Sequence, residues 1–207
     1  MEYLFSTWGM PAFTEEELEA CFPQLRAVFY AAGSVQAFAR PLLNRGIRVF
    51  SAWAANAIPV AEYTAAQIIL AGKGFFQASR LYQGQGWDAA RRHSESQRGS
   101  YGAGVGILGT GMIGREVIRR LKDCRLDVLV FDPFLPEEQA KALGVEKRAL
   151  HEVFAQCRVV SNHLANNAQT VGMLDYDCFS RLDPFSTFLN TGRGAQVAEA
   201  DLVRALR

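Results

Sequence analysis

Three glycines at the spacing G-x-G-x-x-G are the first residues in this sequence that could hold a ligand. Gly109, Gly111 and Gly114 follow the apolar run 105–108 and precede the amphipathic stretch 112–122. In such a loop the first glycine permits a tight turn, the second lets a pyrophosphate approach the backbone, and the third lets the helix close on the strand. The helix N-terminus adds free N–H groups and the positive end of its dipole. The spacing therefore predicts a dinucleotide-phosphate site.

Asp132 is the second candidate for this site. It ends the apolar segment 127–131 and lies 21 residues after Gly111 (132 − 111). Such a loop is followed, about 20 residues on, by an acidic residue that accepts hydrogen bonds from the adenosine ribose. A carboxylate repels the 2′-phosphate of NADP, so Asp132 favours NAD. Met112 and Ile113, at the predicted helix start, complete the site. A glycine turn that binds nothing is the alternative, and the joint occurrence of strand, helix and Asp132 argues against it.

Arg193 is the candidate for binding an acidic substrate. It lies between Gly192 and Gly194, just after the apolar segment 187–190. A guanidinium can donate charge-assisted hydrogen bonds to the carboxylate and carbonyl of a 2-oxo acid, and it stabilises an oxygen that becomes negative when hydride arrives. The alternative is a surface arginine in a loop.

The elements that must position these residues alternate between strands and helices. We expect strands at 3–5, 27–30, 48–50, 105–108, 127–131, 158–162 and 187–190. We expect helices at 59–82, 112–122, 136–143, 151–156 and 199–206, and one that begins at the capping box of Thr14 and Glu17. Several strands are almost continuously apolar, as in parallel sheets covered on both faces. The pattern predicts an α/β protein.

A polar, glycine-containing run over residues 84–100 is expected to be a connecting loop. It divides the chain into a predicted small α/β substrate domain, residues 1–95, and a predicted nucleotide-binding domain, residues 96–207. The small domain includes a long connecting helix with Pro59 in its first turn.

Composition excludes several classes of function. The 207 residues carry 22 basic and 21 acidic side chains, a formal charge of +1, so neither nucleic acid nor an anionic membrane is an expected partner. No segment approaches the ~18 apolar residues of a membrane span, and the N-terminus lacks the basic start of a signal peptide. The four cysteines have neither metal-site nor disulfide spacing, which indicates reduced thiols in the cytoplasm and no metal.

Residues 190–194, Asn-Thr-Gly-Arg-Gly, together with the glycine loop, resemble the D-isomer-specific 2-hydroxyacid dehydrogenase family. Residues 56–62 are similar to that family's asparagine and V-A-E helix start, and residues 163–170 to its H-x-P-x-x-x-x-T stretch. The resemblance implies a Rossmann-like doubly wound NAD domain beside a smaller flavodoxin-like domain, both incomplete. It also implies a cytoplasmic homodimer that transfers hydride between NAD(H) and a small 2-hydroxy or 2-oxo acid.

The resemblance also assigns roles to single residues. Arg193 matches the arginine that anchors the substrate. Leu164, Thr170, Thr191 and Gly192 match positions that border the cofactor.

In the predicted small domain, Gly33 and Ser34 match a loop whose backbone amides hold the substrate carboxylate. Gln36 and Ala37 replace the family's usual glycine and aspartate there, so an ordinary glycine turn is an equal alternative.

The family's proton-transfer histidine and its glutamate lie well beyond the arginine segment. Here the sequence ends 14 residues after Arg193 (207 − 193), and no histidine follows His163. His163 matches a position near the cofactor and is assigned no catalytic role. We therefore expect a chain truncated at its C-terminus, and at its N-terminus too, with weak or no turnover. The alternatives are an NAD-binding fragment and a dehydrogenase-like module that senses NAD or bridges partners.

Overall fold

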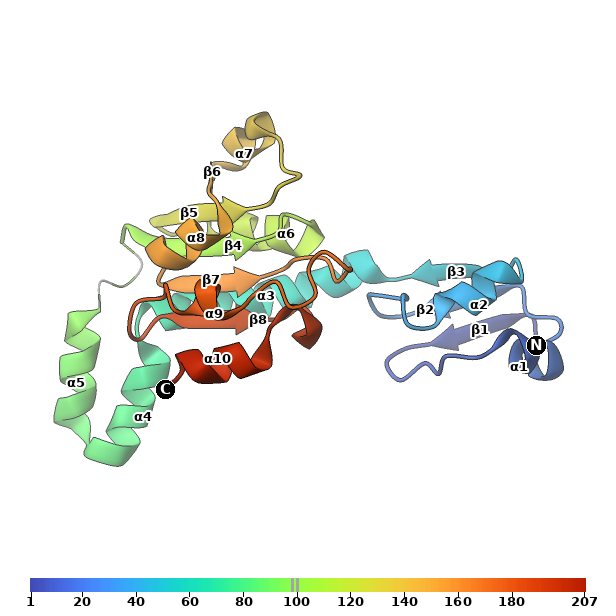
Figure 1. The fold of residues 1–207 in the computed structure, drawn as a ribbon, viewed down its shortest axis with the longest axis horizontal. Helices are drawn as coiled ribbons and strands as arrows, with labels where there is room; N and C mark the ends of the chain where they lie inside the picture. Colours follow the sequence, from blue (N-terminus) through green and yellow to red (C-terminus); the bar gives the residue numbers. More distant parts are fainter. Residues whose placement is uncertain (98, 100) are drawn as a thin grey trace. The chain divides into compact units, whose positions relative to one another are not determined.

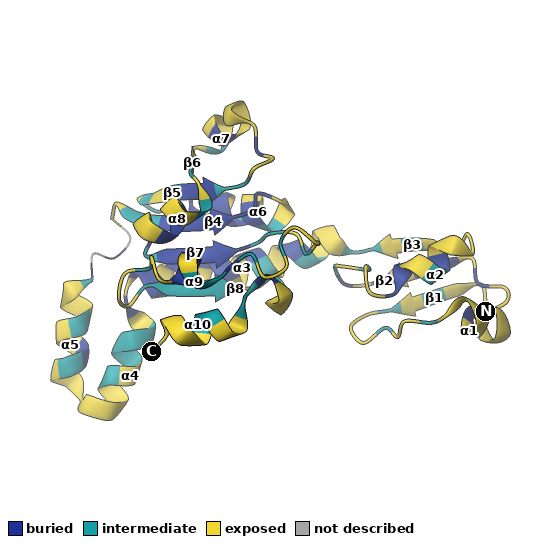
Figure 2. Cartoon of the chain, viewed as in Figure 1, coloured by how far each residue is buried: buried dark blue, intermediate teal, exposed yellow. Residues whose placement is uncertain are grey.

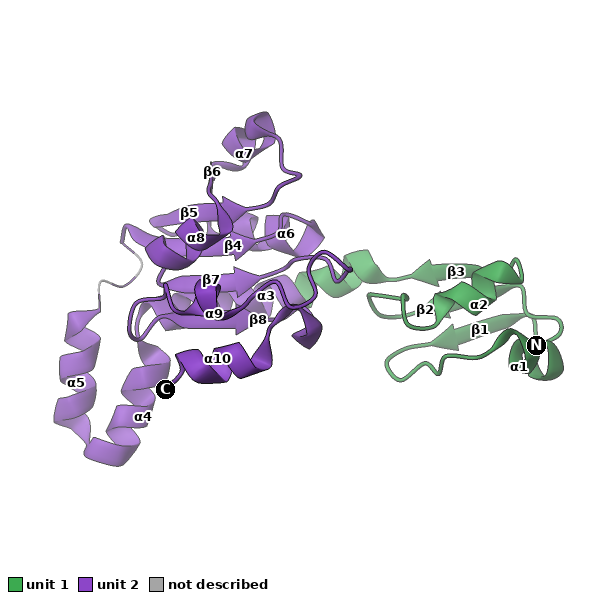
Figure 3. Cartoon of the chain, in the orientation of Figure 1, with its two compact units in different colours: residues 1–59 green, residues 60–207 purple. Residues whose placement is uncertain are grey.

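The computed structural model describes residues 1–97, 99 and 101–207. Their contacts divide the chain into two compact units, residues 1–59 and 60–207 (Figure 3). Each unit contains a parallel sheet of its own (Figure 1). The predicted α/β class with parallel sheets is therefore confirmed.

The first unit contains a three-stranded sheet, two complete helices and the first residues of a third. Its strands β1 (Tyr3–Ser6), β2 (Ala27–Tyr30) and β3 (Arg48–Ser51) lie in that order. The two complete helices are α1 (Glu15–Cys21) and α2 (Ala39–Asn44). The predicted capping box starts α1: Glu17 N–H donates to Thr14 Oγ1 at 3.2 Å, and Thr14 N–H donates to Glu17 Oε2 at 2.9 Å.

One face of this small sheet is aromatic and exposed. Phe29 on β2 stacks between Phe5 on β1 and Phe50 on β3, with ring centroids 5.0 Å apart on each side. The opposite face is buried with Leu18 of α1 and Leu42 of α2. The sheet thus has an apolar core on one side and an aromatic ladder on the other.

The second unit is a five-stranded parallel sheet. Its strands are β4 (Ala103–Leu108), β5 (Leu126–Phe131), β6 (Glu146–Lys147), β7 (Val159–Asn162) and β8 (Thr187–Asn190). They lie in the order β6-β5-β4-β7-β8, which is the 3-2-1-4-5 arrangement of a doubly wound sheet. The order reverses at β4, and ligands of such sheets bind at the carboxyl ends of the strands at this switch point.

Helices cover both faces of this sheet. The helices are α6 (Met112–Leu121), α7 (Glu137–Leu143), α8 (Leu150–Gln156), α9 (Tyr176–Phe179) and α10 (Glu199–Ala205), with a 3-10 turn, η1, at Gly194–Gln196. Side chains of α3 (Trp53–Gly72), α6 and α7 form one core with β4 and β5, and side chains of α8 and α9 form another with β7. The middle strands are consequently the most buried part of the unit (Figure 2).

The long helix expected at residues 59–82 is two helices. Helix α3 (Trp53–Gly72) begins six residues earlier and contains Pro59 in its interior rather than in its first turn. Helix α4 (Phe75–Gln85) follows a break at Gly74, whose φ is +68°. That backbone conformation suits glycine and ends a right-handed helix.

The prediction of a connecting loop at residues 84–100 is wrong for most of that segment. Residues Trp87–Ser96 form helix α5, which packs against α4. This contact stabilises α5 although its apolar pattern is weak, because most helical stability in proteins comes from tertiary packing. Arg98 and Ser100, also in that predicted loop, lie outside the described residues. The domain boundary expected at 95–96 falls at the end of α5, inside the second unit.

No helix in the described parts of the chain is both long and apolar enough to cross a membrane. The four cysteines, Cys21, Cys124, Cys157 and Cys178, are free thiols.

Candidate functional site

The glycine loop connects β4 to α6 at the switch point of the second sheet. Gly109 has a φ of +88°, and its N–H donates to Phe131 O at the end of β5 at 2.8 Å. A Cβ at Gly109 would lie 2.9 Å from His163 O, and one at Gly114 would overlap Gly109 O. Glycine at these two positions therefore lets β4, β7 and α6 approach one another closely.

Gly111 has open surroundings instead. A Cβ there would meet nothing within 4 Å, and no side chain of the described residues caps α6, for which Gly111 is the N-cap. The N–H groups of Met112 and Ile113 belong to the first helical turn and have no partners within the helix. An anion can approach this end of α6, where the helix dipole also favours it.

Asp132 is fixed beside the loop by three hydrogen bonds. Its Oδ2 accepts from Thr110 N–H at 2.8 Å and from Thr110 Oγ1 at 2.5 Å, and its Oδ1 accepts from Phe134 N–H at 2.9 Å. Burial alone would raise the pKa of Asp132. The bonds from Thr110 and Phe134 and the charge of Lys147 outweigh burial and lower that pKa below its usual value. The carboxylate is therefore ionised and can accept a further hydrogen bond from a hydroxyl group.

The loop and Asp132 line one cavity of about 470 Å³, a size typical of small-molecule sites. Five of the predicted cofactor residues contribute to its wall: Gly109, Gly111, Asp132, Leu164 and Thr170. Its other lining residues include Arg115, Phe134 and His163. The structure thus places residues from the ends of β4, β5 and β7 around the same space.

His163 and Thr170 have defined partners in this wall. His163 Nε2 is 2.9 Å from Ser161 Oγ, and burial lowers the pKa of His163 to about 4, so its ring is neutral at pH 7. Thr170 Oγ1 donates to Ala165 O at 2.6 Å and accepts from Asn167 N–H at 3.0 Å. The Thr170 hydroxyl therefore closes the loop that follows β7.

Thr191, Gly192 and Arg193 form the loop after β8 and are outside the lining of that cavity. The Arg193 side chain is exposed, and its Nη1 donates to Gly192 O at 3.2 Å. Among the described residues, no carboxylate lies within ion-pair distance of its guanidinium. The Arg193 charge is therefore accessible to an anionic ligand.

Gly33 and Ser34 lie in the first unit, after β2. Ser51 Oγ donates to Ala32 O at 2.9 Å and to Gly33 O at 2.5 Å, which fixes this turn against β3. Ser34 is exposed. Their assignment to a substrate stays a prediction.

Comparison with known proteins identifies the family to which this chain belongs. Residues 65–207 match the sequence model described as "D-isomer specific 2-hydroxyacid dehydrogenase, NAD binding domain". The chain belongs to this family. The Rossmann-like assignment of the second unit is therefore confirmed, and the cofactor of this 2-hydroxyacid dehydrogenase domain is NAD.

Curated relatives of the chain include two kinds of dehydrogenase. The chain is 32% identical over 163 residues to D-3-phosphoglycerate dehydrogenase of Bacillus subtilis, covering 79% of this chain and 30% of that one. It is 34% identical over 169 residues to formate dehydrogenase of Chaetomium thermophilum, covering 79% and 45%. The chain thus spans less than half the length of these curated relatives.

Solved structures show the same architecture. Apo D-lactate dehydrogenase from Escherichia coli superposes with a TM-score of 0.75 at 25% identity, covering 99% of this chain and 64% of that one. Holo D-mandelate dehydrogenase from Rhodotorula graminis, at 19% identity, has a TM-score of 0.84 and shares the fold, covering 100% and 64%.

The residues present fit an NAD molecule. Gly111 leaves open space at the end of α6, and Asp132 offers an ionised acceptor. Three buried polar atoms in the loops after β7 and β8 have no partner within the described residues: His163 Nδ1, Asn166 Oδ1 and Thr191 Oγ1. Unpaired buried polar atoms cost free energy, and of these three residues His163 lines the cavity, where a polar ligand would pair its Nδ1.

Three residues at this end of the sheet escaped sequence reasoning. Thr110 fixes Asp132, and the buried amides of Asn162 and Gln196 join the loops after β7 and β8. Asn162 gave a signal, because it is a polar residue at the end of a buried apolar strand. Gln196 gave none, since its partners are distant in sequence.

Proposed function

We propose that this chain is the NAD-binding part of an enzyme that transfers hydride between NAD(H) and a small 2-hydroxy or 2-oxo acid. The observation that carries the proposal is the cavity in which Gly111 and Asp132 meet at the carboxyl ends of β4 and β5. An NAD-sensing module without this chemistry has no comparable support, because the named relatives above are dehydrogenases.

The glycine loop and Asp132 would hold the cofactor. Gly109, Gly111 and Gly114, with the N–H groups of Met112 and Ile113, receive the pyrophosphate. Asp132 accepts hydrogen bonds from the adenosine ribose. NAD, when bound, supplies or accepts the hydride.

Residues of the two loops after β7 and β8 would border the same ligand. Leu164 and Thr170 do so after β7, and Thr191 and Gly192 after β8. The buried Thr191 hydroxyl, unpaired among the described residues, is suited to a polar atom of the cofactor.

Arg193 would bind the acid. Its exposed guanidinium donates hydrogen bonds to the substrate carboxylate and carbonyl, and its charge stabilises the oxygen that becomes negative during reduction. Gly33 and Ser34 are proposed, on the family resemblance alone, to contribute backbone N–H groups to a substrate carboxylate.

Titration of NADH and NADPH, followed by fluorescence, tests the cofactor assignment. We expect NADH to bind at least about tenfold more tightly than NADPH, because Asp132 repels a 2′-phosphate. Asp132→Ala should remove most of this preference. Equal affinity for both cofactors in the wild-type chain would contradict the assignment.

Oxamate, an unreactive analogue of a small 2-oxo acid, tests Arg193. In the presence of NADH, we expect Arg193→Gln to weaken oxamate binding by about tenfold or more. Arg181→Gln replaces another exposed arginine and should leave it unchanged. Equal oxamate affinity in the two variants would remove Arg193 from the site.

Turnover by the 207 residues themselves should be slow. His163 lines the cavity, but its ring is neutral at pH 7 and its Nε2 lies beside Ser161 Oγ, so it is not a positioned proton donor. Loss of a positioned proton donor costs about 10²–10⁴ in rate. Rapid NADH oxidation with glyoxylate, pyruvate or hydroxypyruvate would contradict this expectation.

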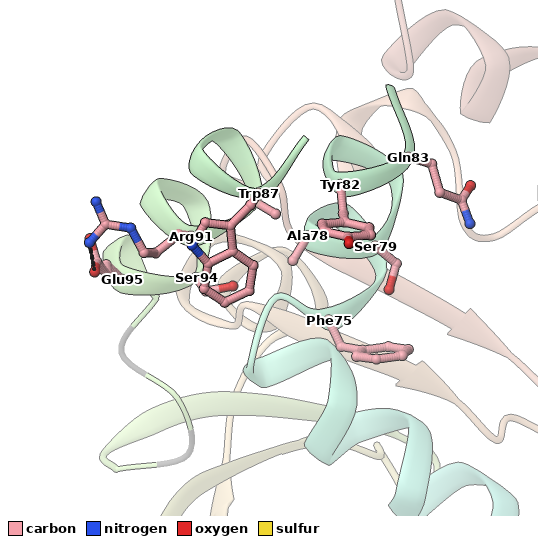
Figure 4. A pocket seen from close by; sticks show the side chains of 10 residues that line it. Phe75, Ala78, Ser79, Tyr82, Gln83, Trp87, Arg91, Ser94 and Glu95 are labelled. Carbon is pink, nitrogen blue, oxygen red and sulfur yellow. Dashed lines mark hydrogen bonds and ion pairs between the residues drawn. The ribbon is translucent and has the colours of Figure 1, made fainter. Parts of the chain in front are cut away.

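We also propose a cytoplasmic homodimer. Helices α4 and α5 form an apolar groove of about 530 Å³, and Phe75, Tyr82 and Trp87 along it are exposed (Figure 4). Exposed aromatic grooves are typical of protein interfaces. Free thiols support the cytoplasmic location.

Light scattering after size-exclusion chromatography tests the dimer. The wild-type chain should elute with twice the mass of one chain, and Trp87→Ser should shift it toward the monomer. A wild-type monomer at high concentration would contradict the dimer.

A further inference from the structure

Three side-chain amides meet between the ends of β7 and β8. Asn162 ends β7, Asn190 ends β8, and the two residues are partners in the parallel register. Gln196 reaches them from the turn η1. Asn162 and Gln196 are fully buried. Burying an amide costs free energy unless its donors and acceptors form hydrogen bonds, so each of these amides is expected to have partners.

The pairing is complete for Asn162 and for both N–H donors of Gln196. Asn162 Nδ2 donates to Gln196 Oε1 at 2.7 Å and to Asn190 Oδ1 at 3.2 Å, while Asn162 Oδ1 accepts from Leu164 N–H at 3.1 Å. Gln196 Nε2 donates to Leu164 O at 2.8 Å and to Ala165 O at 3.0 Å. Backbone groups have fixed donor or acceptor character, so each amide has only one orientation that satisfies them.

The same amides hold the backbone that carries Arg193. Asn190 Oδ1 accepts from Gly192 N–H at 3.0 Å, and Asn190 Nδ2 donates to Arg193 O at 3.3 Å. Gln196 N–H donates to Arg193 O as well, also at 3.3 Å. A Cβ on Gly192 would lie 3.1 Å from Gln196 Oε1, so a side chain there would crowd this amide.

The cluster therefore joins two functional segments. Leu164 and Ala165 line the cofactor cavity, and Arg193 lies in the loop after β8. We propose that Asn162, Asn190 and Gln196 are positioning residues that fix Arg193 relative to the Leu164–Ala165 segment. This inference rests on the proposed function, because it concerns where a substrate-binding arginine stands beside a bound cofactor. A misplacement of about 1 Å can cost an active site about 10²-fold in rate.

Gln196→Met tests the inference. It keeps the length and volume of the side chain but removes the donors to Leu164 O and Ala165 O. Ile68→Val is the matched control, because it shortens a buried side chain of α3 and lowers stability without touching either loop. Asn190→Ala is the second variant; Asn190 is exposed, so its loss should be tolerated while removing the contacts to Gly192 and Arg193.

Two measurements are made on all three variants and the wild-type chain. The first is oxamate affinity in the NADH complex, beside NADH affinity alone. We expect Gln196→Met and Asn190→Ala to weaken oxamate by about tenfold, NADH by less than about threefold, and Ile68→Val to change neither. The second is amide hydrogen exchange without ligand. Gln196→Met should speed exchange in residues 163–167 and 190–197, and Ile68→Val should not.

The outcomes separate two failures. If the wild-type chain binds no oxamate, the proposed substrate class is wrong, and exchange still decides whether the cluster orders both loops. If oxamate binds but Gln196→Met behaves as Ile68→Val does in both measurements, the positioning inference is overturned while the proposed function stands.

Discussion

Within the described part of the chain, the Thr110 side chain forms one hydrogen bond, from its Oγ1 to Asp132 Oδ2. Thr110→Val removes this donor and keeps the backbone N–H that also binds Asp132. We expect the pKa of Asp132 to rise toward its ordinary value and the free energy of unfolding at pH 7 to fall by about 1 kcal/mol. Carbon NMR of the carboxyl group and urea unfolding measure the two effects.

The stability difference between wild type and Thr110→Val should depend on pH, because it acts through the charge of Asp132. The pKa of Asp132 is lower in the folded chain than its ordinary value of 3.8. The stability that the Asp132 carboxylate contributes is therefore present above pH 3.8 and is lost as the pH falls through the folded pKa. Wild type and Thr110→Val should therefore converge in acid. In an Asp132→Asn background the difference between them should no longer depend on pH. A difference that stays pH-dependent in that background would show that Thr110 acts through another group.

His163 should make the folded chain less stable in mild acid. Its pKa is about 4 when folded against the usual 6.5, because the ring is buried. Between these values the unfolded chain binds the extra proton, so stability falls as pH decreases, by about 2 kcal/mol between pH 7 and pH 5. His163→Gln should remove that loss in urea unfolding at the two pH values. The exposed His151→Gln should retain it, and equal slopes for the two variants would contradict the role of burial.

At the scale of elements, Gly74 and Gly84 make a matched pair on α4. Gly74 has a φ of +68°, and a Cβ there would lie 2.6 Å from Gln97 Cγ. Gly84 lies within the helix, and a Cβ there would meet nothing within 4 Å. Gly74→Ala should therefore lower the free energy of unfolding by about 1–2 kcal/mol, whereas Gly84→Ala should raise it by about 0.5 kcal/mol. Equal effects of the two substitutions in thermal unfolding would contradict the break at Gly74.

At this scale, most strands were predictable because they are short apolar runs. Strand β6 was missed, because its two residues, Glu146 and Lys147, are both charged. Segments 27–30 and 187–190 match β2 and β8 without error, and the other predicted strands differ by one or two residues. Between residues 53 and 96 the sequence predicted a helix at 59–82, but the start of α3, the break before α4 and the whole of α5 were not predictable from local pattern. Pro59 indicates a first turn, yet it is inside α3, and α5 depends on its contact with α4. Tertiary packing overrides local preference in both cases.

The candidate site divides in the same way. The glycine loop and Asp132 follow a local spacing, and the structure places them around one cavity. The amide cluster depends on the register that pairs Asn162 with Asn190, which are 28 residues apart. A single sequence does not reveal such a register, because any polar residue at a strand end could face water instead.

At the scale of the whole molecule, the two sheets differ in how their faces are covered. The sheet of the second unit has a helical core on each face, as parallel sheets normally do. The sheet of the first unit has buried helices against one face only, while Phe5, Phe29 and Phe50 form the exposed ladder on the other. A contiguous aromatic surface of this kind promotes association, whereas single exposed apolar residues are ordinary.

Replacing the outer rings of the ladder should therefore change the behaviour of the chain in solution more than its stability. Phe5→Thr with Phe50→Thr removes side chains that are 76% and 47% exposed and keeps residues suited to strands. We expect weaker binding of the dye ANS and slower aggregation on concentration, with the free energy of unfolding lowered by only about 1 kcal/mol through lost stacking. Leu206→Thr removes a side chain that is 78% exposed and lies outside the ladder, and it should alter neither dye binding nor aggregation. If Leu206→Thr reduced both as much as the double variant does, total exposed apolar area, and not the continuity of the ladder, would govern association.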